Sequence, residues 1–289
     1  MAEQKAQVII IGGGPAGVSA ALYLARAGVR TTIIENGPGA LARAHKIDNY
    51  YGIAASGARL YAAGLEQAEA LGVSIRQDEV LSVEYTDSFT LSLKTTAEQL
   101  SAPALILATG TKNITLNLPG LVQLEGKGIS YCAVCDGFFF RKKQVAVLGS
   151  GAYALHEAAY LRHLAQSVTI LTNGQSGEAA QSAGFDVKTA KLVQLNGDSR
   201  LTGISFDDGS TLEVDGLFIA MGTADSTDIA RKLGAQTNGR FIKIDADGKT
   251  NIPGLFAAGD CTGGLLQVSK AVHEGAQAGL AALNFIRNK

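Results

Sequence analysis

The sequence has no tryptophan, and aromatic residues of all kinds make up only 6% of its 289 positions. It also lacks a net charge of one sign, since 25 basic residues are balanced by 26 acidic ones. Nucleic acids and anionic membranes attract proteins through a concentrated positive field, so neither is expected as a partner. No apolar run approaches the ~18 residues that a membrane-spanning helix requires. These absences leave a protein or a small molecule as the expected partner.

Cysteine is scarce as well, since the chain contains only Cys132, Cys135 and Cys261. Cys132 and Cys135 form a single Cys-x-x-Cys pair, which in a reducing compartment is typical of redox catalysis rather than of a structural disulfide framework. The N-terminal residues include no apolar segment of signal-peptide length, so we expect a cytoplasmic protein. A zinc site needs four ligands, and the sequence offers no second pair beside the first, so we expect no metal.

Glycine, by contrast, is abundant at 35 residues, which suits an α/β architecture with many tight strand-to-helix turns. A strand–turn–helix–strand unit is predicted over residues 7–34, and a second copy is predicted over residues 145–171. A long helix is predicted over residues 268–286, with small and apolar residues spaced to dock against a nucleotide-binding domain. These elements predict two nucleotide-type folds in one chain.

The expected fold class is therefore α/β, with two Rossmann-like three-layer nucleotide-binding domains. A length of 289 residues fits two domains. Because the last helix is expected to dock against a nucleotide-binding domain, the first domain is predicted to be discontinuous. We assign residues 1–115 and 243–289 to this first domain, and residues 116–242 to a central domain that carries the cysteine pair.

The first nucleotide site is predicted at the turn between the first strand and the first helix. Its sequence, GGGPAG, fits the pattern G-x-G-x-x-G directly after a strand, where backbone amides and the helix dipole can hold a pyrophosphate. Glu35 follows the second strand and can accept a hydrogen bond from a ribose hydroxyl. Gly259 and Asp260 follow a later strand and would bring a second segment to the same ligand, which favours FAD over NAD. The residues assigned to the turn are Gly12, Gly14, Pro15, Ala16 and Gly17.

The cysteine pair lies between the two nucleotide-type units. Two intervening residues allow Cys132 and Cys135 to close a small-ring disulfide, and a position at a helix start makes a thiol more reactive. The adjacent carboxyl of Asp136 can transfer a proton. Cys261 is interpreted as a small filler near the flavin site and is assigned no role.

Taken together, these motifs resemble those of the low-molecular-weight thioredoxin reductases, in family order and over nearly the whole chain. The glycine turn with its acidic partner and the cysteine pair carry most of the resemblance, and the segment Asp48–Gly52 is similar to a flavin-contacting motif of the family. The remaining matches are Ala108, Thr109 and Gly110, which we assign to the cofactor site, and the Gly259–Asp260 pair.

The resemblance also implies roles for individual residues. Cys135 would be the sulfur next to the flavin, and Cys132 would be the sulfur that attacks the protein substrate. Asp136 would protonate the departing or resting thiol, and Asn49 would contact the isoalloxazine ring. The family further implies a homodimer that serves thioredoxin or a thioredoxin-like protein.

The second nucleotide-type unit departs from the family pattern. Its turn at Gly149–Ala154 keeps the shape G-x-G-x-x-A, but residues 172–174 read Thr-Asn-Gly where NADPH-dependent relatives have His-Arg-Arg. A 2′-phosphate without arginine partners loses its charge-assisted hydrogen bonds, and Glu178 would repel it. NADH is disfavoured too, because no acidic residue ends the preceding strand. A branch of the family that keeps the cysteine pair without the nicotinamide motifs takes electrons from reduced ferredoxin, so ferredoxin is the leading donor hypothesis.

Four functions stay open at this point. The leading one is a FAD-dependent disulfide reductase that passes electrons from ferredoxin through FAD and the cysteine pair to thioredoxin or a thioredoxin-like protein. A conventional NADPH-dependent thioredoxin reductase is the alternative, with residues 141–143 as a rebuilt phosphate site. A FAD-dependent dithiol oxidase that releases peroxide is a second alternative. The non-enzymatic alternative is a flavin-bound redox sensor.

Overall fold

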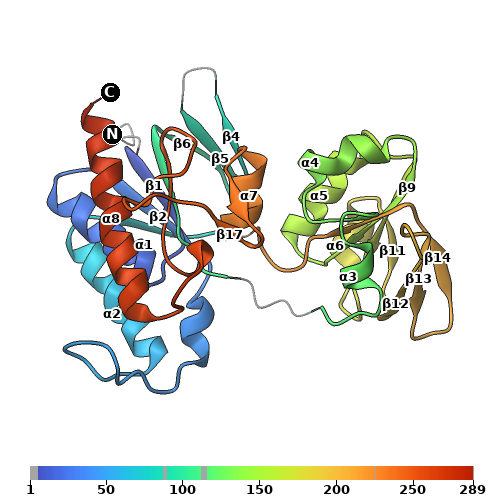
Figure 1. The fold of residues 1–289 in the computed structure, drawn as a ribbon, viewed down its shortest axis with the longest axis horizontal. Helices are drawn as coiled ribbons and strands as arrows, with labels where there is room; N and C mark the ends of the chain where they lie inside the picture. The colour runs from blue at the N-terminus through green and yellow to red at the C-terminus, as the bar shows by residue number, and fades with distance from the viewer. Residues whose placement is uncertain (1–5, 87–89, 112–115, 225, 289) are drawn as a thin grey trace. The chain divides into compact units, whose positions relative to one another are not determined.

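The structure, a computed structural model, describes residues 6–86, 90–111, 116–224 and 226–288. The chain divides into two compact units that both mix helices and strands (Figure 1). Each unit is built on a parallel sheet of five strands, which is the arrangement expected of a nucleotide-binding domain. The predicted α/β fold class is thus confirmed. None of the helices within the described ranges is long and apolar enough to cross a bilayer.

The two units comprise Met1–Lys112 with Asp225–Lys289, and Asn113–Ala224. This division places residues 225–242 in the first unit, whereas the sequence pattern placed them in the second domain. Helix α7 (Ser226–Lys232) begins this segment, and the backbone N–H of Ser226 donates a hydrogen bond to Thr109 Oγ1 at 2.9 Å. The chain therefore returns to the first unit earlier than the sequence indicates. The polar contact between Thr109 and Ser226 lies at this boundary, and a polar contact leaves no hydrophobic pattern from which the boundary could be predicted.

The parallel sheet of the first unit has the strand order β18–β7–β1–β2–β3. Every residue of β1, β2, β7 and β18 is buried, as is typical of parallel strands covered on both faces. The strand bounds are β1 Val8–Ile11, β2 Thr31–Glu35, β3 Ser74–Gln77, β7 Ala104–Leu107 and β18 Leu255–Ala257.

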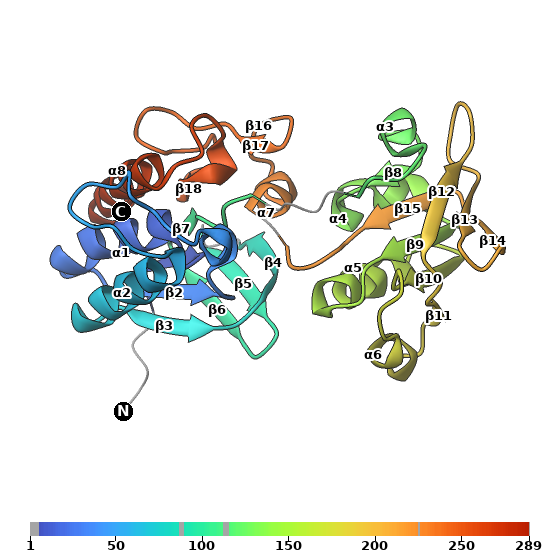
Figure 2. The ribbon, with the colours of Figure 1, turned by 90° about the horizontal axis from the view of Figure 1, so that it is seen from below.

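Helices cover one face of this sheet, and a three-stranded antiparallel sheet covers the other (Figure 2). The C-terminal helix α8 packs directly on α1, since a Cβ added to Gly275 would lie 2.1 Å from the carbonyl oxygen of Ala16. This close approach docks the C-terminal segment on the N-terminal βαβ unit, as the sequence predicts. The elements are α1 Pro15–Arg26, η1 Gly39–Arg43, α2 Gly57–Ala70, β4 Val80–Tyr85, β5 Leu91–Thr95, β6 Gln99–Ala102, β16 Thr237–Asn238, β17 Phe241–Ile242, η3 Asp260–Thr262 and α8 Val268–Arg287.

The second unit repeats the βαβ plan of the first. Its parallel sheet has the order β11–β10–β9–β15–β8, and the consecutive elements β9, α5 and β10 correspond to β1, α1 and β2. The second copy predicted over residues 145–171 is thus confirmed. Its elements are α3 Leu121–Leu124, β8 Ile129–Ser130, α4 Ala133–Asp136, η2 Gly137–Phe140, β9 Gln144–Leu148, α5 Ala152–Arg162, β10 Ser167–Leu171, α6 Glu178–Ser182, β11 Asp186–Lys188, β12 Leu192–Asn196, β13 Gly203–Phe206, β14 Thr211–Glu213 and β15 Gly216–Ile219.

Candidate functional site

The first glycine turn joins β1 to α1, and its glycines have different steric surroundings. Gly12 has a φ of +114°, and a Cβ added there would lie 2.3 Å from the carbonyl oxygen of Ala108. A Cβ added to Gly17 would lie 1.9 Å from the carbonyl oxygen of Gly12. Gly14, by contrast, would have no atom within 4 Å of its added Cβ. Two glycines therefore close the turn, and the third leaves the backbone open to a ligand.

Helix α1 begins at this open position. Gly14 is its N-cap residue without a side-chain cap hydrogen bond, and Pro15 is the first helical residue. The first-turn amides of a helix capped in this way suit an anion such as a pyrophosphate. Ala16 lies against the later segment, because a Cβ added to Gly259 would lie 2.9 Å from the Cβ of Ala16. The turn, the Ala108 carbonyl and Gly259 thus meet at one end of the sheet, and this arrangement fits the predicted dinucleotide.

Glu35 is the last residue of β2 and is buried, with 8% of its surface exposed. Its Oε2 atom accepts hydrogen bonds from the backbone N–H of Gly37 at 2.7 Å and from the Tyr61 hydroxyl. Burial, followed by the hydrogen bond to Glu35, raises the pKa of the Tyr61 hydroxyl, which is a donor at neutral pH. The carboxylate is held beside the turn, since a Cβ added to Gly13 would lie 2.9 Å from the Cβ of Glu35.

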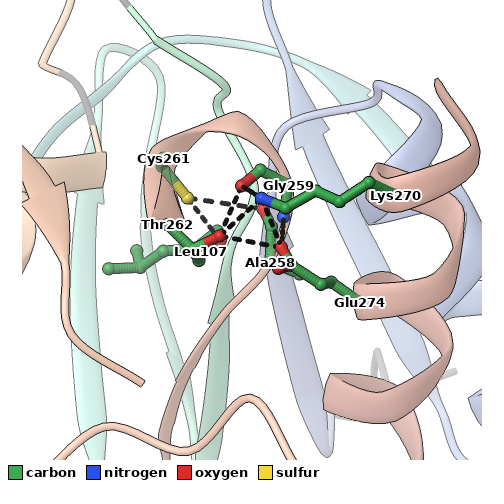
Figure 3. Close-up of polar contacts among 7 residues, drawn as sticks. All are labelled: Leu107, Ala258, Gly259, Cys261, Thr262, Lys270 and Glu274. Atoms are coloured by element: carbon green, nitrogen blue, oxygen red, sulfur yellow. Dashed lines mark hydrogen bonds and ion pairs between the residues drawn. The ribbon is translucent and has the colours of Figure 1, made fainter. Parts of the chain in front are cut away.

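Two charged residues of α8 hold the segment that begins at Gly259 (Figure 3). Lys270 Nζ donates to the Gly259 carbonyl at 2.8 Å and to Thr262 Oγ1 at 2.7 Å. Glu274 Oε2 accepts from the Gly259 N–H at 2.8 Å and from Thr262 Oγ1 at 2.8 Å. The Lys270 and Glu274 side chains form an ion pair at 2.9 Å and are only 15% and 16% exposed. We call this pair the α8 clamp, and the sequence pattern did not predict it.

Asp260 and Cys261 follow the clamped glycine. Burial raises the pKa of the Asp260 carboxyl, and the nearby Lys270 ammonium opposes the shift. Cys261 is 1% exposed, and its Sγ lies 3.5 Å from the Leu107 carbonyl and 3.3 Å from the Ala258 carbonyl. Burial raises the pKa of the Cys261 thiol to about 12. This sulfur is a protonated packing group, which agrees with its interpretation as a filler.

The segment Ala108–Gly110 also joins the first turn. Thr109 is paired with Ser226 by a hydrogen bond between the two hydroxyl groups at 2.8 Å and by one from the Thr109 N–H to Ser226 Oγ at 3.1 Å. Ser226 is fully buried at the start of α7. It was not predicted as a site residue, since a lone serine 117 positions away carries no local signal.

Asn49 lies in the loop between η1 and α2, which the bridge between Ile47 and Ala55 closes. Its Nδ2 donates a hydrogen bond to Gln267 Oε1 at 3.0 Å. Gln267 is the N-cap residue of α8, so the Asn49 side chain lies at the start of that helix. Gln267 is thus a second polar group beside the residue assigned to the flavin ring.

The redox pair forms a disulfide between Cys132 and Cys135, with their Cα atoms 5.3 Å apart. Cys132 is the N-cap residue of α4, and its sulfur accepts a hydrogen bond from the Cys135 N–H at 3.1 Å. Asp136 ends the same helix, and its Oδ2 accepts a hydrogen bond from Ser130 Oγ at 2.7 Å. The structure therefore brings the three predicted redox residues into one turn.

Helix α5 supports this redox turn. Glu157 of α5 is 2% exposed, and its Oε2 accepts a hydrogen bond from the Ala133 N–H at 2.8 Å. Gly137 packs on the end of the helix, since a Cβ added there would lie 3.1 Å from Leu164 and 3.2 Å from Leu161. Neither Ser130 nor Glu157 was identified from the sequence, because both act through contacts with the folded redox turn.

The second glycine turn, between β9 and α5, has the same construction as the first. Gly149 has a φ of +153°, and a Cβ added there would lie 2.3 Å from the carbonyl oxygen of Ala220. Gly151 is the N-cap residue of α5 without a side-chain cap hydrogen bond, and the nearest atom to its added Cβ is 3.8 Å away. A phosphate-binding turn is therefore preserved in backbone form.

The loop after β10 is tied to its own neighbours. Thr172 is 3% exposed, and its Oγ1 donates to the Gln175 carbonyl at 2.6 Å. Asn173 Oδ1 accepts from the Leu192 N–H at 3.0 Å, and the Ser150 hydroxyl of the glycine turn bonds the Gln175 side chain. The side chains of this loop that make these hydrogen bonds are neutral. The loop therefore does not offer the pair of charge-assisted hydrogen bonds that an arginine side chain would make to a 2′-phosphate.

A cationic side chain from another segment does approach this loop. A Cβ added to Gly174 would lie 2.9 Å from Cε of Lys191. An open cavity of about 520 Å³ lies here, lined by Lys188 and Lys191 but also by Asp207 and Asp208. Lys188 pairs with Asp208 at 3.1 Å. The cavity thus has two lysines matched by two aspartates rather than a net positive charge.

Known proteins of one enzyme family are similar to this chain in sequence and in structure. Residues 6–275 match the family model for pyridine nucleotide-disulphide oxidoreductases. A thioredoxin reductase of Streptomyces coelicolor is 35% identical over 274 residues, which cover 88% of this chain and 85% of that protein. The crystal structure of the atypical thioredoxin reductase TRi from Desulfovibrio vulgaris Hildenborough has a TM-score of 0.92 at 42% identity and 99% coverage of both chains. A ferredoxin-flavin thioredoxin reductase from Clostridium acetobutylicum has a TM-score of 0.73 at 29% identity, again with 99% coverage of both chains.

Proposed function

Since the chain belongs to the pyridine nucleotide-disulphide oxidoreductase family, and within it to the low-molecular-weight thioredoxin reductases, we propose that it reduces thioredoxin or a thioredoxin-like protein with electrons from ferredoxin. It is a FAD-dependent enzyme of the thioredoxin-disulfide reductase type. The family, the enzyme class and the cofactor all agree with the expectations from the sequence. The electron donor and the protein substrate are the parts proposed here.

The residues of the first unit fit FAD. The open backbone at Gly14 and the first turn of α1 would hold the pyrophosphate, with Gly12 and Gly17 closing the turn. Glu35 would accept from a ribose hydroxyl, since Gly37 and Tyr61 already fix its carboxylate. Bound FAD supplies a redox group that accepts electrons singly or in pairs and delivers two to a disulfide. The further residues proposed for the site are Pro15, Ala16, Asn49, Ala108, Thr109, Gly110, Gly259 and Asp260.

The cysteine pair would pass these electrons on by thiol–disulfide exchange. Two electrons and two protons convert the Cys132–Cys135 disulfide into two thiols. The Cys132 thiol then loses its proton, and the thiolate attacks the partner's disulfide, forming a mixed disulfide and releasing one partner thiolate, which takes up a proton. Cys135, after losing its proton, attacks the Cys132 sulfur, so that the internal disulfide re-forms and the second partner thiolate leaves and takes up the second proton. Asp136 would carry the proton to and from the cysteine thiols.

The observation that carries the donor proposal is the loop after β10. Its buried Thr172 and the neutral side chains around it replace the arginines that would bind a nicotinamide 2′-phosphate. A one-electron carrier would not need that loop, because it reduces FAD without occupying a nucleotide turn. One of the similar structures is named a ferredoxin-flavin thioredoxin reductase, which supports the same proposal.

A second candidate is an NADPH-dependent thioredoxin reductase. The intact turn at Gly149–Gly151 and the approach of Lys191 to Gly174 favour it. The lysine would then have to serve as a substitute for the missing arginines. Its neighbours Asp207 and Asp208 line the same cavity, and this negative charge argues against a phosphate dianion there.

A turnover assay separates these candidates. FAD-loaded protein is mixed anaerobically with oxidised thioredoxin and either photoreduced ferredoxin or NADPH, and the new thioredoxin thiols are counted by alkylation and mass spectrometry. We expect thiols with ferredoxin and only background with NADPH, and C135S should give none with either donor. Thiol formation with NADPH at the higher rate would contradict the ferredoxin proposal and support the second candidate.

A further inference from the structure

The buried hydroxyl of Ser130 links the backbone of the first redox cysteine to the carboxyl group of Asp136. Ser130 is the last residue of β8 and is 4% exposed. Its Oγ lies 2.7 Å from Asp136 Oδ2 and 3.1 Å from the backbone nitrogen of Cys132. One side chain thus joins the backbone of the first cysteine to the carboxyl group that ends the same helix.

The geometry fixes the direction of these hydrogen bonds. The Cys132 N–H can only donate, so Ser130 Oγ is the acceptor of that bond. The hydroxyl proton then has two possible acceptors, Asp136 Oδ2 at 2.7 Å and the Cys132 carbonyl at 3.3 Å. A carboxylate makes the shorter and stronger bond, so the proton points to Asp136. The resulting chain runs from the Cys132 N–H through the serine hydroxyl to the acid.

We propose that Ser130 is a positioning residue for Asp136, and this inference rests on the proton-carrying role given to Asp136 under the proposed function. Asp136 is half-buried at the end of a one-turn helix, where its backbone is fixed by a hydrogen bond from its N–H to the Cys132 carbonyl at 3.1 Å. The backbone bond does not select a rotamer for the side chain. The hydrogen bond from Ser130 does, and it fixes the carboxyl group within the redox turn.

Glu157 provides an internal comparison, because it binds a backbone N–H of the same turn from helix α5. Its carboxylate accepts the Ala133 N–H at 2.8 Å and is as deeply buried as Ser130. Glu157 therefore supports the backbone of the redox turn, whereas Ser130 supports the backbone and also orients Asp136. Substitutions at the two residues should disturb the turn similarly but should differ in their dependence on Asp136.

The experiment is a double-mutant cycle on the half-reaction between the disulfide and a small dithiol. Oxidised holoenzyme is mixed anaerobically with dithiothreitol, quenched with iodoacetamide and analysed by mass spectrometry for alkylated Cys132 and Cys135. The variants are S130A, S130T, D136N, E157Q and the doubles S130A/D136N and E157Q/D136N. Because neither ferredoxin nor thioredoxin takes part, a failure of the proposed donor or substrate leaves this test intact.

We expect S130A to slow disulfide reduction by about tenfold in the wild-type background, as a general acid that is no longer aligned loses part of its effect. In the D136N background the same change should slow disulfide reduction by less than about twofold, since the effects of two residues that act through one another are not additive. E157Q should slow the reaction by the same factor in both backgrounds. S130T keeps the hydroxyl and should restore the wild-type rate to within about threefold.

Two results would overturn the proposal. One is an equal slowing by S130A with and without Asp136, which would mean that Ser130 acts only on the fold of the turn. The other is an S130T variant as slow as S130A, which would mean that the hydroxyl is not the active feature. The flavin absorbance spectrum of each variant shows that the holoenzyme is intact, so a variant that does not fold is recognised before its rate is interpreted.

Discussion

The two glycine turns of this chain have the same backbone form but lead to strands that end in different residues. In both, a Cβ on the first glycine would lie 2.3 Å from a carbonyl oxygen of a neighbouring segment, and in both a glycine caps the next helix without a side-chain bond. The strand after the first turn ends at the buried carboxylate of Glu35, whereas the strand after the second leads to Thr172, which bonds its own loop. Packing thus maintains the shape of both turns, and we expect the residue at the end of the strand that follows each turn to determine which nucleotide binds there.

The largest effect that tests this comparison is expected from G14V. The position has room for a side chain in the protein itself, since no atom lies within 4 Å of an added Cβ, and its φ of −76° is accessible to valine. The side chain would instead occupy the place of the pyrophosphate, so we expect FAD affinity to fall by ~100-fold or more. Titration of apoprotein with FAD, followed by flavin fluorescence, measures the loss. An unchanged affinity for FAD would show that the first glycine turn is not part of the cofactor site.

A smaller effect is expected from breaking the α8 clamp with E274Q. The carboxylate accepts from Gly259 and Thr262 and pairs with Lys270 at low exposure, so its loss leaves a largely buried ammonium with a neutral partner. We expect a loss of ~1–3 kcal/mol in the free energy of unfolding, measured by urea denaturation, together with weaker FAD binding. The exposed pair of Lys249 and Asp247 is the matched control, and K249M should leave both quantities unchanged. Equal effects of the two variants would contradict a specific role for the clamp.

A third variant, Y61F, tests the acidic end of the first βαβ unit. Removing the hydroxyl deletes a donor to Glu35 but leaves the Gly37 N–H in place. We expect the dissociation constant of FAD to rise by about three- to tenfold, the equivalent of one ordinary hydrogen bond. The corresponding change in the second unit, T172V, should leave FAD binding as it is in the wild type. A T172V variant that loses FAD would show that the two strand ends are not functionally distinct.

The smallest effect is expected from G151V, the counterpart of G14V in the second turn. Its φ of −90° and the distance of 3.8 Å from an added Cβ to the nearest atom allow the substitution. If the second turn holds no nicotinamide cofactor during catalysis, ferredoxin-dependent turnover should change by less than about twofold, within the range of a neutral surface substitution. A large loss of turnover in G151V would show that this turn takes part in the reaction.

The sequence was informative wherever a function depends on local spacing. The glycine turns, Glu35 and the pair Cys132–Cys135 all lie within short segments whose spacing sets their geometry. Both βαβ units and the C-terminal helix could be predicted for the same reason, since hydrophobic periodicity is a local signal.

The partners that complete the site could not be predicted, because the fold brings them in from distant segments. Ser226 meets Thr109 across 117 positions, and this contact also returns the chain to the first unit before the predicted boundary. Glu157 reaches the redox turn from the next helix, and the α8 clamp reaches Gly259 from the C-terminal helix. A lone serine, lysine or glutamate has no pattern of its own, so only the packed structure identifies its role.

The most direct test of ferredoxin dependence is anaerobic mixing of the oxidised, FAD-loaded protein with NADPH, NADH and, separately, photoreduced ferredoxin. The loss of flavin absorbance is followed in a stopped-flow instrument. We predict rapid bleaching by ferredoxin and negligible bleaching by either nicotinamide, because the loop after β10 lacks the groups that bind them. Rapid bleaching by NADPH would contradict ferredoxin dependence and would mean that the second glycine turn still binds its dinucleotide.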